Sequence, residues 1–424
     1  MLHIDLFEKL SSAKDLQEEL SLSKEDQPIC SHTKLSLPNS KDAKQPIAEK
    51  CPMRNLLDIE RPFVLVPATS HSRLAPWIIG DCSGKKWVRL HQEIVGFVRY
   101  ISPTYAEREV RKRIVREVRG MCSDLWPGCR VETFGSMNTN LLLPKSDIDI
   151  CVMNVHEDIY DAMCLLAKRI EDSLLAEYGS VRIIDSAKVP IVKFIYKESQ
   201  YGIDICINAE EGLINTAAVC EFLDLYPMAY PLIMIVKMYL YLRRLHEPYH
   251  GGLGSYATTL LVISFLQNHP YKEMQYADQK IVSAGILLAD FFRFLGFYFN
   301  YTNVGLSILQ GGECFRKTDR DTRGLLVEDP SYPENNAGSA ARHFGSISRS
   351  FEAAYMILMT DDTNILDKLP EVSSIGNKKG SLDEPKVVPH SEWRLSRLIW
   401  ISNQEHNFRA NLSNVLETMQ RAGK

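Results

Sequence analysis

Two aspartates alternate with isoleucines in "FGSMNTNLLLPKSDIDICVMN", residues 134–154, inside an otherwise apolar run. If this run is an extended strand, Asp147 and Asp149 point to one face, and Ile148 and Ile150 point to the other. Burying one carboxylate without a partner is costly, and burying two on the same face is more so. The pair therefore requires positive charge close by.

A third aspartate, Asp204, lies in "GIDICIN" with the same alternation. If the two strands are neighbours, the three carboxylates converge, and they raise one another's pKa unless cations lie between them. Mg²⁺ accepts a few carboxylates together with phosphate oxygens. Two such ions, about 3.5–4 Å apart, clamp the attacking and leaving oxygens of an in-line displacement. The pattern predicts that Asp147, Asp149 and Asp204 bind two Mg²⁺ or Mn²⁺ ions.

The dipeptide Gly135-Ser136 precedes the paired aspartates. A turn that enters a short helix presents free backbone N–H groups, which favour a phosphate. Gly135 would let the backbone approach closely, and Ser136 would add a hydroxyl donor. Alone, Gly-Ser is typical of an ordinary turn and D-x-D of an exposed edge. The third strand aspartate favours the phosphate and metal interpretation.

Lys237 lies in the apolar run "YPLIMIVKMYLYL". On a helix, its neighbours three and four residues away are apolar or aromatic. Such a lysine either extends its ammonium group to solvent or binds an anion. A triphosphate would satisfy it.

The composition is that of a globular protein long enough for two domains, with 424 residues of which 45% are hydrophobic and 24% charged. The formal net charge of −4 gives no global basic field for nucleic acid, so a polyanion would need local cations, metal ions or a partner. The ten cysteines form no C-x-x-C pair, which is typical of reduced thiols in an intracellular protein. No signal peptide and no membrane-spanning run are expected.

Polarity and periodicity divide the chain. Residues 1–75 are polar and poorly periodic, which predicts disorder, although "LHIDLF" and "PFVLVP" are candidate docking segments. Helical periodicity begins near Leu90, and Thr104 and Glu107 have capping-box spacing at the start of a second helix. A long helix over 158–178 and several short strands predict a compact α/β or α+β unit. From 213 to 359 the pattern is mostly helical, and a polar linker and a short helix follow.

Several of these segments together resemble a known family. "FGSMNTNLLLPKSDIDI" has the Gly-Ser and D-x-D signature of the DNA polymerase β-like nucleotidyltransferases. The segments "LHQEIVGFVRYISPTYAE", "VPIVKFIY", "GGLGSYATTLLVISFLQNHP" and "VEDPSYPENNAGS" are similar to the TRAMP-type poly(A) polymerases of nuclear RNA surveillance. The resemblance extends from about Trp77 to Met359.

The resemblance implies an α+β, two-lobed enzyme. A nucleotidyltransferase palm with a mixed β-sheet would occupy residues 102–211 and carry Asp147, Asp149 and Asp204. A mostly helical central domain, of the type associated with poly(A) polymerases, would comprise residues 77–101 and 212–360. Residues 1–75 would form a largely disordered extension, and 361–424 a polar linker and C-terminal tail.

The resemblance also implies which residues contact the nucleotide. Asn215 matches a ribose contact, although the residue type is equally compatible with a helix cap. Lys237 matches a triphosphate contact. Tyr256 matches the aromatic residue that stacks on the base, whereas by sequence alone it suits a hydrophobic core. The expected nucleotide-binding set is Gly135, Ser136, Asn215, Lys237, Ser255, Tyr256, Asn335 and Asn336.

The loop "EDPSYPENNAGS" matches the nucleotide-recognition motif of the family. Asparagine both donates and accepts hydrogen bonds, so Asn335 or Asn336 could read an adenine edge, although Pro and Asn are also ordinary turn residues. Relatives that add uridine often carry a histidine here, so Asn335 favours ATP. The chain departs from the family at Tyr241, where relatives often carry a second basic residue that Arg243 or Arg244 could replace.

The implied function is template-independent addition of AMP from ATP to RNA 3′ ends, with Asp204 as the base or activating carboxylate. The resemblance further implies a nuclear location and two partners, a zinc-knuckle RNA-binding protein and an RNA helicase. No RNA-binding module is recognisable in the sequence, which is why such partners are expected. Two alternatives stay open, a terminal uridylyltransferase and a catalytically inactive scaffold of a surveillance complex.

Overall fold

The computed structural model describes residues 75–78, 86–270, 283–318, 324–360 and 393–422. The candidate docking segments at residues 2–7 and 62–67, and the polar stretch from 361 to 392, lie outside these ranges. The chain divides into two compact units. Gly96–Asp224 and Trp400–Lys424 belong to one, here called the sheet unit, and Gly80–Val95 and Leu225–Ile399 belong to the other, the helical unit.

The boundary between the units differs in position from the sequence-based division. The sequence placed the end of the palm at residue 211, where α8 (Glu211–Leu225) begins. The division in the structure falls at the end of that helix, between Asp224 and Leu225, and it also falls inside α4 (Lys86–Ile101), between Val95 and Gly96. The residues of α8 therefore group with the sheet.

The sheet unit is built on a five-stranded mixed sheet in the order β1-β2-β5-β4-β3. Strands β2 and β5 are parallel, and the other neighbouring pairs are antiparallel. This arrangement confirms the predicted α+β class with a mixed sheet. The strands are β1 (Arg130–Phe134), β2 (Ile148–Met153), β3 (Arg182–Ile184), β4 (Ile191–Ile195) and β5 (Gly202–Ile207).

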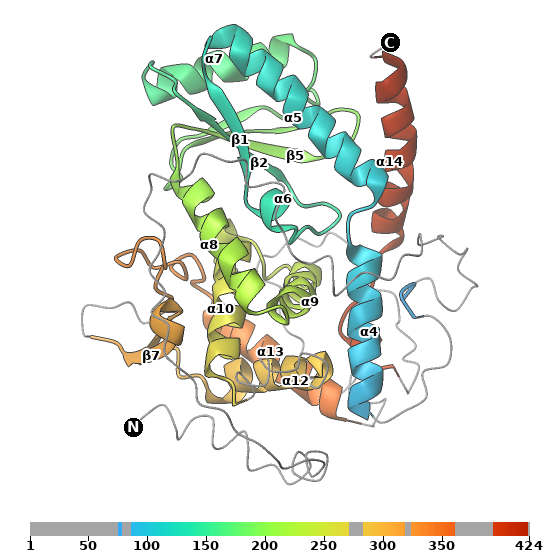
Figure 1. Ribbon diagram of the computed structural model, residues 1–424, viewed down its shortest axis with the longest axis vertical. Helices are drawn as coiled ribbons and strands as arrows, with labels where there is room; N and C mark the ends of the chain where they lie inside the picture. The colour runs from blue at the N-terminus through green and yellow to red at the C-terminus, as the bar shows by residue number, and fades with distance from the viewer. Residues whose placement is uncertain (1–74, 79–85, 271–282, 319–323, 361–392, 423–424) are drawn as a thin grey trace. The chain divides into compact units, whose positions relative to one another are not determined.

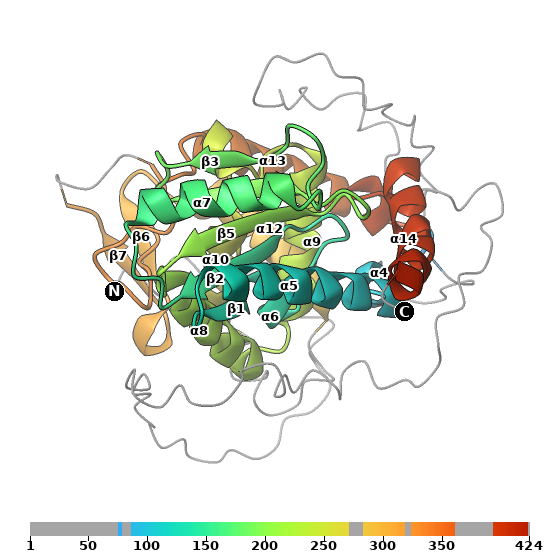
Figure 2. The ribbon, with the colours of Figure 1, turned by 90° about the horizontal axis from the view of Figure 1, so that it is seen from above.

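The alternation in the sequence determines which side chains each face of the sheet carries. Ile148, Ile150 and Val152 of β2 are fully buried in the main core, whereas Cys151 packs on the opposite face with Cys206. Helices α5 (Tyr105–Leu125) and α7 (Ile159–Asp172) lie across the first face (Figure 2). The aspartates share the second face with the cysteines, because residues two apart on a strand point the same way.

Local signals explain the helices before the sheet. The stripe of apolar residues predicted in α4 is buried, and Thr104 caps α5 with the predicted capping box to Glu107. The short helix α6 (Ser136–Thr139) follows β1. Near the C-terminus, α14 (Asn403–Ala422) packs beside α5 (Figure 1) and contributes Leu412 to the same core.

The long helix expected over residues 158–178 is shorter than predicted. It begins with Asp158 as its N-cap, but α7 ends at Asp172. Leu174 adopts a positive φ of 59°, which stops helical geometry, and Ala176 then forms a β-bridge to Tyr196. Pairing with the sheet therefore replaces the last turns of the predicted helix.

The helical unit contains α9 (Ala229–Leu242), α10 (Ser255–Asn268), α12 (Ala284–Arg293) and α13 (Phe344–Met359). Aromatic rings form much of the packing, with Phe291, Phe292 and Phe351 in mutual contact and Tyr239 against two of them. The sequence did not predict the antiparallel pair of β6 (Val304–Ser307) and β7 (Glu313–Arg316), which lies between α12 and α13 in the sequence. Short turns of helix are η2 (Pro248–His250), η3 (Phe294–Tyr298), η4 (Leu309–Gly311) and η6 (Leu395–Arg397).

None of the helices in the described ranges has the length and hydrophobicity that a membrane span requires.

A buried carboxylate connects the first part of α4 to the segment around η6. Glu93 accepts hydrogen bonds from the backbone N–H of Arg394 at 2.9 Å, of Leu395 at 2.8 Å and of Ser396 at 3.3 Å. Burial raises the pKa of Glu93 to about 7, although these N–H groups and Arg397 act in the opposite direction. The carboxyl group of Glu93 thus caps the start of η6, about 300 positions later in the sequence.

We expect the contribution of Glu93 to make stability fall between about pH 4.5 and pH 7. In this window the unfolded chain has released the proton of Glu93 while the folded chain retains it, so the slope of stability against pH is negative. The shift corresponds to a change on the order of 3 kcal/mol, at about 1.4 kcal/mol per pKa unit. Thermal denaturation at pH 5 and pH 7.5 should show this slope weakened in Glu93→Gln, and equal slopes in both proteins would contradict the assignment.

Candidate active site

The parallel pairing of β2 with β5 places two of the candidate carboxylates side by side. Asp149 and Asp204 are direct partners in the register of this strand pair. Asp147 lies just before β2, on the same face as Asp149. The sequence argument required these two strands to be neighbours, and the sheet order shows that they are.

Lys193, on the antiparallel neighbour β4, connects two of the carboxylates. Its Nζ lies 2.8 Å from Oδ2 of Asp147 and 2.9 Å from Oδ1 of Asp204. Burial lowers the pKa of Lys193, but the two carboxylates outweigh it and raise the pKa overall. The lysine is therefore charged, and it supplies the positive partner that the aspartates require.

Gly135 approaches the third carboxylate closely. Its φ is +65°, a backbone conformation that side chains disfavour, and a Cβ atom there would lie 2.7 Å from Oδ2 of Asp149. The backbone N–H of Gly135 donates to Oγ1 of Thr216 at 2.7 Å, and this hydroxyl donates to the carbonyl of Gly212. The absent side chain thus makes room for the carboxylate of Asp149.

The candidates Ser136 and Asn215 are the sequence neighbours of the two residues that form this hydrogen bond, Gly135 and Thr216. Ser136 is the first residue of α6, directly after Gly135. Asn215 precedes Thr216 in the second turn of α8, so it does not cap the start of that helix. Its buried Oδ1 has no hydrogen-bond partner among the described residues. A ligand that donates a hydrogen bond there would satisfy this atom.

A second cluster, centred on Asp329, lies within the helical unit. Asp329 is fully buried, and its carboxylate accepts hydrogen bonds from the hydroxyl of Tyr256 at 3.0 Å, the backbone N–H of Ser331 at 3.0 Å and Nδ2 of Asn335 at 2.8 Å. Burial and the neighbouring carboxylate raise the pKa of Tyr256, so its hydroxyl keeps its proton and donates. Two candidate nucleotide contacts, from α10 and from the recognition loop, are thus joined by one carboxylate.

The two adjacent asparagines have different environments. The side chain of Asn336 accepts from the backbone N–H of Val327 at 3.0 Å and of Gly338 at 2.8 Å, and donates to the carbonyl of Leu325 at 2.9 Å. Asn336 therefore braces the loop from within. This leaves Asn335 as the better candidate for reading a base.

The remaining candidates of the helical unit are placed as follows. Lys237 is buried in α9, with 6% of its surface exposed, and Ser255 is exposed at the start of α10. The guanidinium group of Arg243 lies 3.6 Å from the ring centre of Tyr239 and donates to the carbonyl of Leu398 at 3.0 Å. Arg243 is committed to packing, so of the two proposed replacements for a second basic residue only Arg244 remains a candidate.

The donor set at the sheet fits a hard divalent cation. In the described part of the chain, no group of three or more His, Cys, Asp or Glu side chains is arranged to hold a metal ion by itself. Mg²⁺ commonly uses one or two carboxylates and completes its shell with phosphate oxygens and water. Asp147 and Asp204 already converge on one cation, the ammonium of Lys193. Their oxygens suit Mg²⁺ or Mn²⁺ in type and in charge.

Sequence reasoning missed three residues of these clusters, which are Lys193, Thr216 and Asp329. Lys193 is a lysine inside the apolar strand "PIVKFIY", which is a usable signal, because a strand lysine needs a negative partner. Asp329 stands before a proline and a serine, where an aspartate typically caps a turn. Nothing in the sequence around Thr216 indicates its contact with Gly135.

Two family models match the chain. Residues 90–224 match the central palm domain of mitochondrial-like poly(A) RNA polymerases, and residues 283–335 match the Cid1 family of poly(A) polymerases. The first match covers the sheet and all three aspartates, and the second reaches the recognition loop. Both matches indicate a nucleotidyltransferase.

Individual relatives agree with the family models. The chain is 36% identical over 284 residues to poly(A) RNA polymerase CID14 of Cryptococcus neoformans, which covers 63% of this chain and 36% of that protein. It is 33% identical over 299 residues to poly(A) RNA polymerase protein 1 of Saccharomyces cerevisiae, covering 67% of this chain and 46% of the relative. The matched region thus spans between about a third and a half of these relatives.

A solved structure of the polymerase core of TRAMP, an RNA surveillance complex, is 31% identical to this chain, with a TM-score of 0.62. The match covers 71% of this chain and 97% of that one. A structure of the Cid1 poly(U) polymerase, 21% identical with a TM-score of 0.56, shares the fold. The chain belongs to the TRAMP-type poly(A) RNA polymerase family.

One relative shows that membership does not by itself establish catalysis. The inactive poly(A) RNA polymerase protein Trf4-2 of Drosophila melanogaster is 32% identical over 281 residues, which cover 68% of that protein. An argument for activity must therefore come from the chemistry of this chain's own residues.

Gly135→Ala tests the contact that makes room for Asp149. We expect a loss of about 1–2 kcal/mol in stability from the positive φ, and at least a tenfold loss of the nucleotide addition proposed below, because the added Cβ displaces the carboxylate. Gly120→Ala is the matched control, because nothing lies within 4 Å of its Cβ position. Thermal denaturation and a primer-extension rate measure the two effects. If both variants kept full activity, the close approach of Gly135 to Asp149 would have no functional role.

Proposed function

We propose that this chain is a template-independent poly(A) polymerase that adds AMP from ATP to RNA 3′ ends. The observation that carries the proposal is the in-register pairing of Asp149 with Asp204 on adjacent strands, with Asp147 joined to Asp204 through Lys193. This chain retains all three carboxylates, which separates it in chemistry from a scaffold without catalytic function.

Asp147, Asp149 and Asp204 would bind two Mg²⁺ or Mn²⁺ ions. When bound, such ions stabilise the charge that develops on the attacking and leaving oxygens of phosphoryl transfer. The 3′-hydroxyl oxygen of the RNA forms a bond to the α-phosphorus, the bond to the bridging oxygen of the β-phosphate breaks, and pyrophosphate leaves. Asp204 accepts the hydroxyl proton. Gly135 would let the backbone approach the triphosphate closely, and Ser136 would bind the triphosphate through its hydroxyl group.

The Asp329 cluster supports a preference for adenine. A carboxylate only accepts hydrogen bonds, so the amide nitrogen of Asn335 must face Asp329, and the amide oxygen lies at the other end of the side chain. That oxygen is an acceptor, which complements the N6 amino group of adenine and repels the O4 carbonyl of a uracil. Tyr256, also fixed by Asp329, would stack on the base.

The other nucleotide contacts and the cellular role belong to the same proposal. Asn215 would accept a hydrogen bond from the ribose, and Lys237, Ser255 and Arg244 would lie near the triphosphate. The family relationship supports a nuclear role in RNA surveillance, with a zinc-knuckle RNA-binding protein and an RNA helicase as partners. A net charge of −4 makes such partners useful, because nonspecific attraction to RNA phosphates is weak.

A primer-extension assay with each of the four nucleotides tests the function. We expect the full chain with Mg²⁺ to extend a short RNA with ATP in preference to UTP, and Asp149→Ala to lower the rate by several orders of magnitude, since about 1.4 kcal/mol of lost transition-state stabilisation corresponds to a tenfold effect. Asp158→Ala, a helix cap on the same unit, is the matched control.

The outcomes separate the alternatives. Extension with UTP in preference to ATP would identify a terminal uridylyltransferase. The absence of extension by a folded wild-type chain, alone and with RNA in excess, would favour the inactive scaffold, for which Trf4-2 of Drosophila melanogaster is a precedent within the family.

Base choice should depend on Asn335 and not on Asn336. We expect Asn335→Ala to reduce the ratio of kcat/KM for ATP over UTP by about tenfold, because the oriented acceptor is lost. Asn336→Ala should instead lower thermal stability and raise KM for both nucleotides, because three hydrogen bonds within the loop are lost. Steady-state extension kinetics provide the measurement, and the reverse pattern would assign base reading to Asn336.

A further inference from the structure

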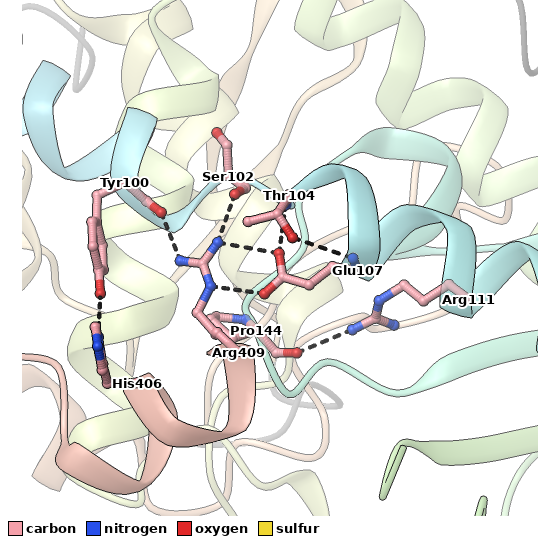
Figure 3. A network of polar contacts seen from close by, with 8 residues as sticks. All are labelled: Tyr100, Ser102, Thr104, Glu107, Arg111, Pro144, His406 and Arg409. Atoms are coloured by element: carbon pink, nitrogen blue, oxygen red, sulfur yellow. Dashed lines mark hydrogen bonds and ion pairs between the residues drawn. The ribbon is translucent and has the colours of Figure 1, made fainter. Parts of the chain in front are cut away.

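The C-terminal helix α14 is fixed to the start of α5 by a buried ion pair. Arg409 Nε lies 2.7 Å from Oε1 of Glu107, and its guanidinium also donates to the carbonyls of Tyr100 at 2.6 Å and Ser102 at 2.9 Å. Glu107 in turn accepts from the backbone N–H of Thr104 at 2.6 Å. Figure 3 shows these groups converging between the two helices. Almost none of either charged side chain is exposed, so their hydrogen bonds replace water.

One turn further along α5, a second buried cation contacts the segment that leads to Asp147. Arg111 is 2% exposed, and its Nη2 donates to the carbonyl of Pro144 at 3.3 Å (Figure 3). Its guanidinium lies 3.9 Å from the ring centre of Tyr201. Burial lowers the pKa of Arg111, and Tyr201, Glu107 and Asp147 oppose this effect. The charges therefore alternate in sign from Arg409 through Glu107 and Arg111 to Asp147.

Phe408, next to Arg409 on α14, contacts both chain segments that lead to the carboxylates. Its ring meets that of Tyr201 edge-on, with centres 5.4 Å apart. The ammonium of Lys145 lies 5.6 Å from the ring centre of Phe408. Lys145 is two residues before Asp147, and Tyr201 immediately precedes β5, which carries Asp204. A helix from the far end of the chain thus contacts the approach to each of these aspartates.

We propose that Arg111 and Phe408 are positioning residues that set the affinity of the Asp147–Asp204 pair for a divalent cation. Two carboxylates bind one cation well only if their spacing is fixed beforehand, because their repulsion otherwise separates them. Arg111 donates to the carbonyl of Pro144, three residues before Asp147, while Phe408 packs on Tyr201 and Lys145. The inference rests on the proposed function for the identity of the cation. It adds that Arg111 and Phe408 hold the two carboxylates at a fixed spacing before the cation binds.

The experiment measures cation binding without turnover. The melting temperature of the full-length chain is recorded against Mg²⁺ concentration, without RNA or nucleotide, because a ligand that binds the folded state raises stability according to its Kd. We expect Arg111→Met to increase the half-saturating Mg²⁺ concentration by about 10–100-fold, the usual effect of removing a group that orients metal ligands. Arg111→Lys, which keeps the charge but loses the planar contacts, should show a smaller increase. Arg108→Met, exposed on the same helix, should match the wild type.

Phe408→Leu is a second variant, and it should disturb folding less than Arg111→Met. The side chain of Phe408 is only partly buried, and the substitution leaves the ion pair of Arg409 in place. We expect a severalfold increase in half-saturating Mg²⁺, with the exposed Asn407→Ala as its control. The Mg²⁺ dependence of RNA extension should shift in parallel for both variants, with kcat largely recovered at high Mg²⁺.

Three outcomes would overturn the inference. Variants that melt lower by the same amount at every Mg²⁺ concentration would show that the network supports packing alone. Variants with wild-type Mg²⁺ dependence, or a wild-type chain that Mg²⁺ does not stabilise, would equally contradict it. A wild-type chain that binds Mg²⁺ but does not extend RNA would instead overturn the proposed function and leave the positioning role standing.

Discussion

Repulsion between carboxylates on adjacent strands is the constraint to which the rest of the sheet unit responds. Parallel pairing of β2 with β5 makes Asp149 the direct neighbour of Asp204. Two like charges about 4 Å apart repel by roughly 1 kcal/mol in water and roughly 4 kcal/mol near a protein surface. Lys193 on the next strand, in register with Asp204, offsets this repulsion with a positive charge. Gly135, which has no side chain, leaves room for the carboxylate of Asp149. Positive charge and empty space thus occur where the carboxylates need them.

Patterns within single segments predicted the strand β2 and the start of α5, because alternation and helix capping depend only on residues close together in the sequence. Alternation assigned the aspartates and the isoleucines of β2 to opposite faces, and the spacing of Thr104 and Glu107 identified the start of α5. The partner of Lys193 could not be predicted in the same way. It depends on the order β1-β2-β5-β4-β3, in which the strand between β4 and β2 comes from later in the sequence. The position of a strand can be predicted from its own residues, but the strand that pairs with it in the sheet cannot.

Long-range contacts also explain where local patterns were insufficient or misleading. The apolar periodicity after residue 158 suggested a helix to 178, but pairing of Ala176 with Tyr196 ended it early. Arg243 resembled a free cation near the candidate triphosphate site, but stacking on Tyr239 commits it to packing. The sequence predicted a short helix near the C-terminus, but not the contact by which its Arg409 meets Glu107 across 302 positions of sequence. None of these contacts has a signal within its own segment.

Each unit contains a buried carboxylate that holds other polar side chains in one orientation. Glu107 is satisfied by Thr104 and Arg409, and Asp329 by Ser331 and Tyr256. A buried ion pair contributes little net stability, since desolvation offsets most of the attraction, and an apolar pair of equal size often stabilises as well. Apolar groups, however, cannot determine which end of an amide faces inward or where a guanidinium points. The orientation that Glu107 gives to the guanidinium of Arg409, and Asp329 to the amide of Asn335, accounts for the charge at each of these positions.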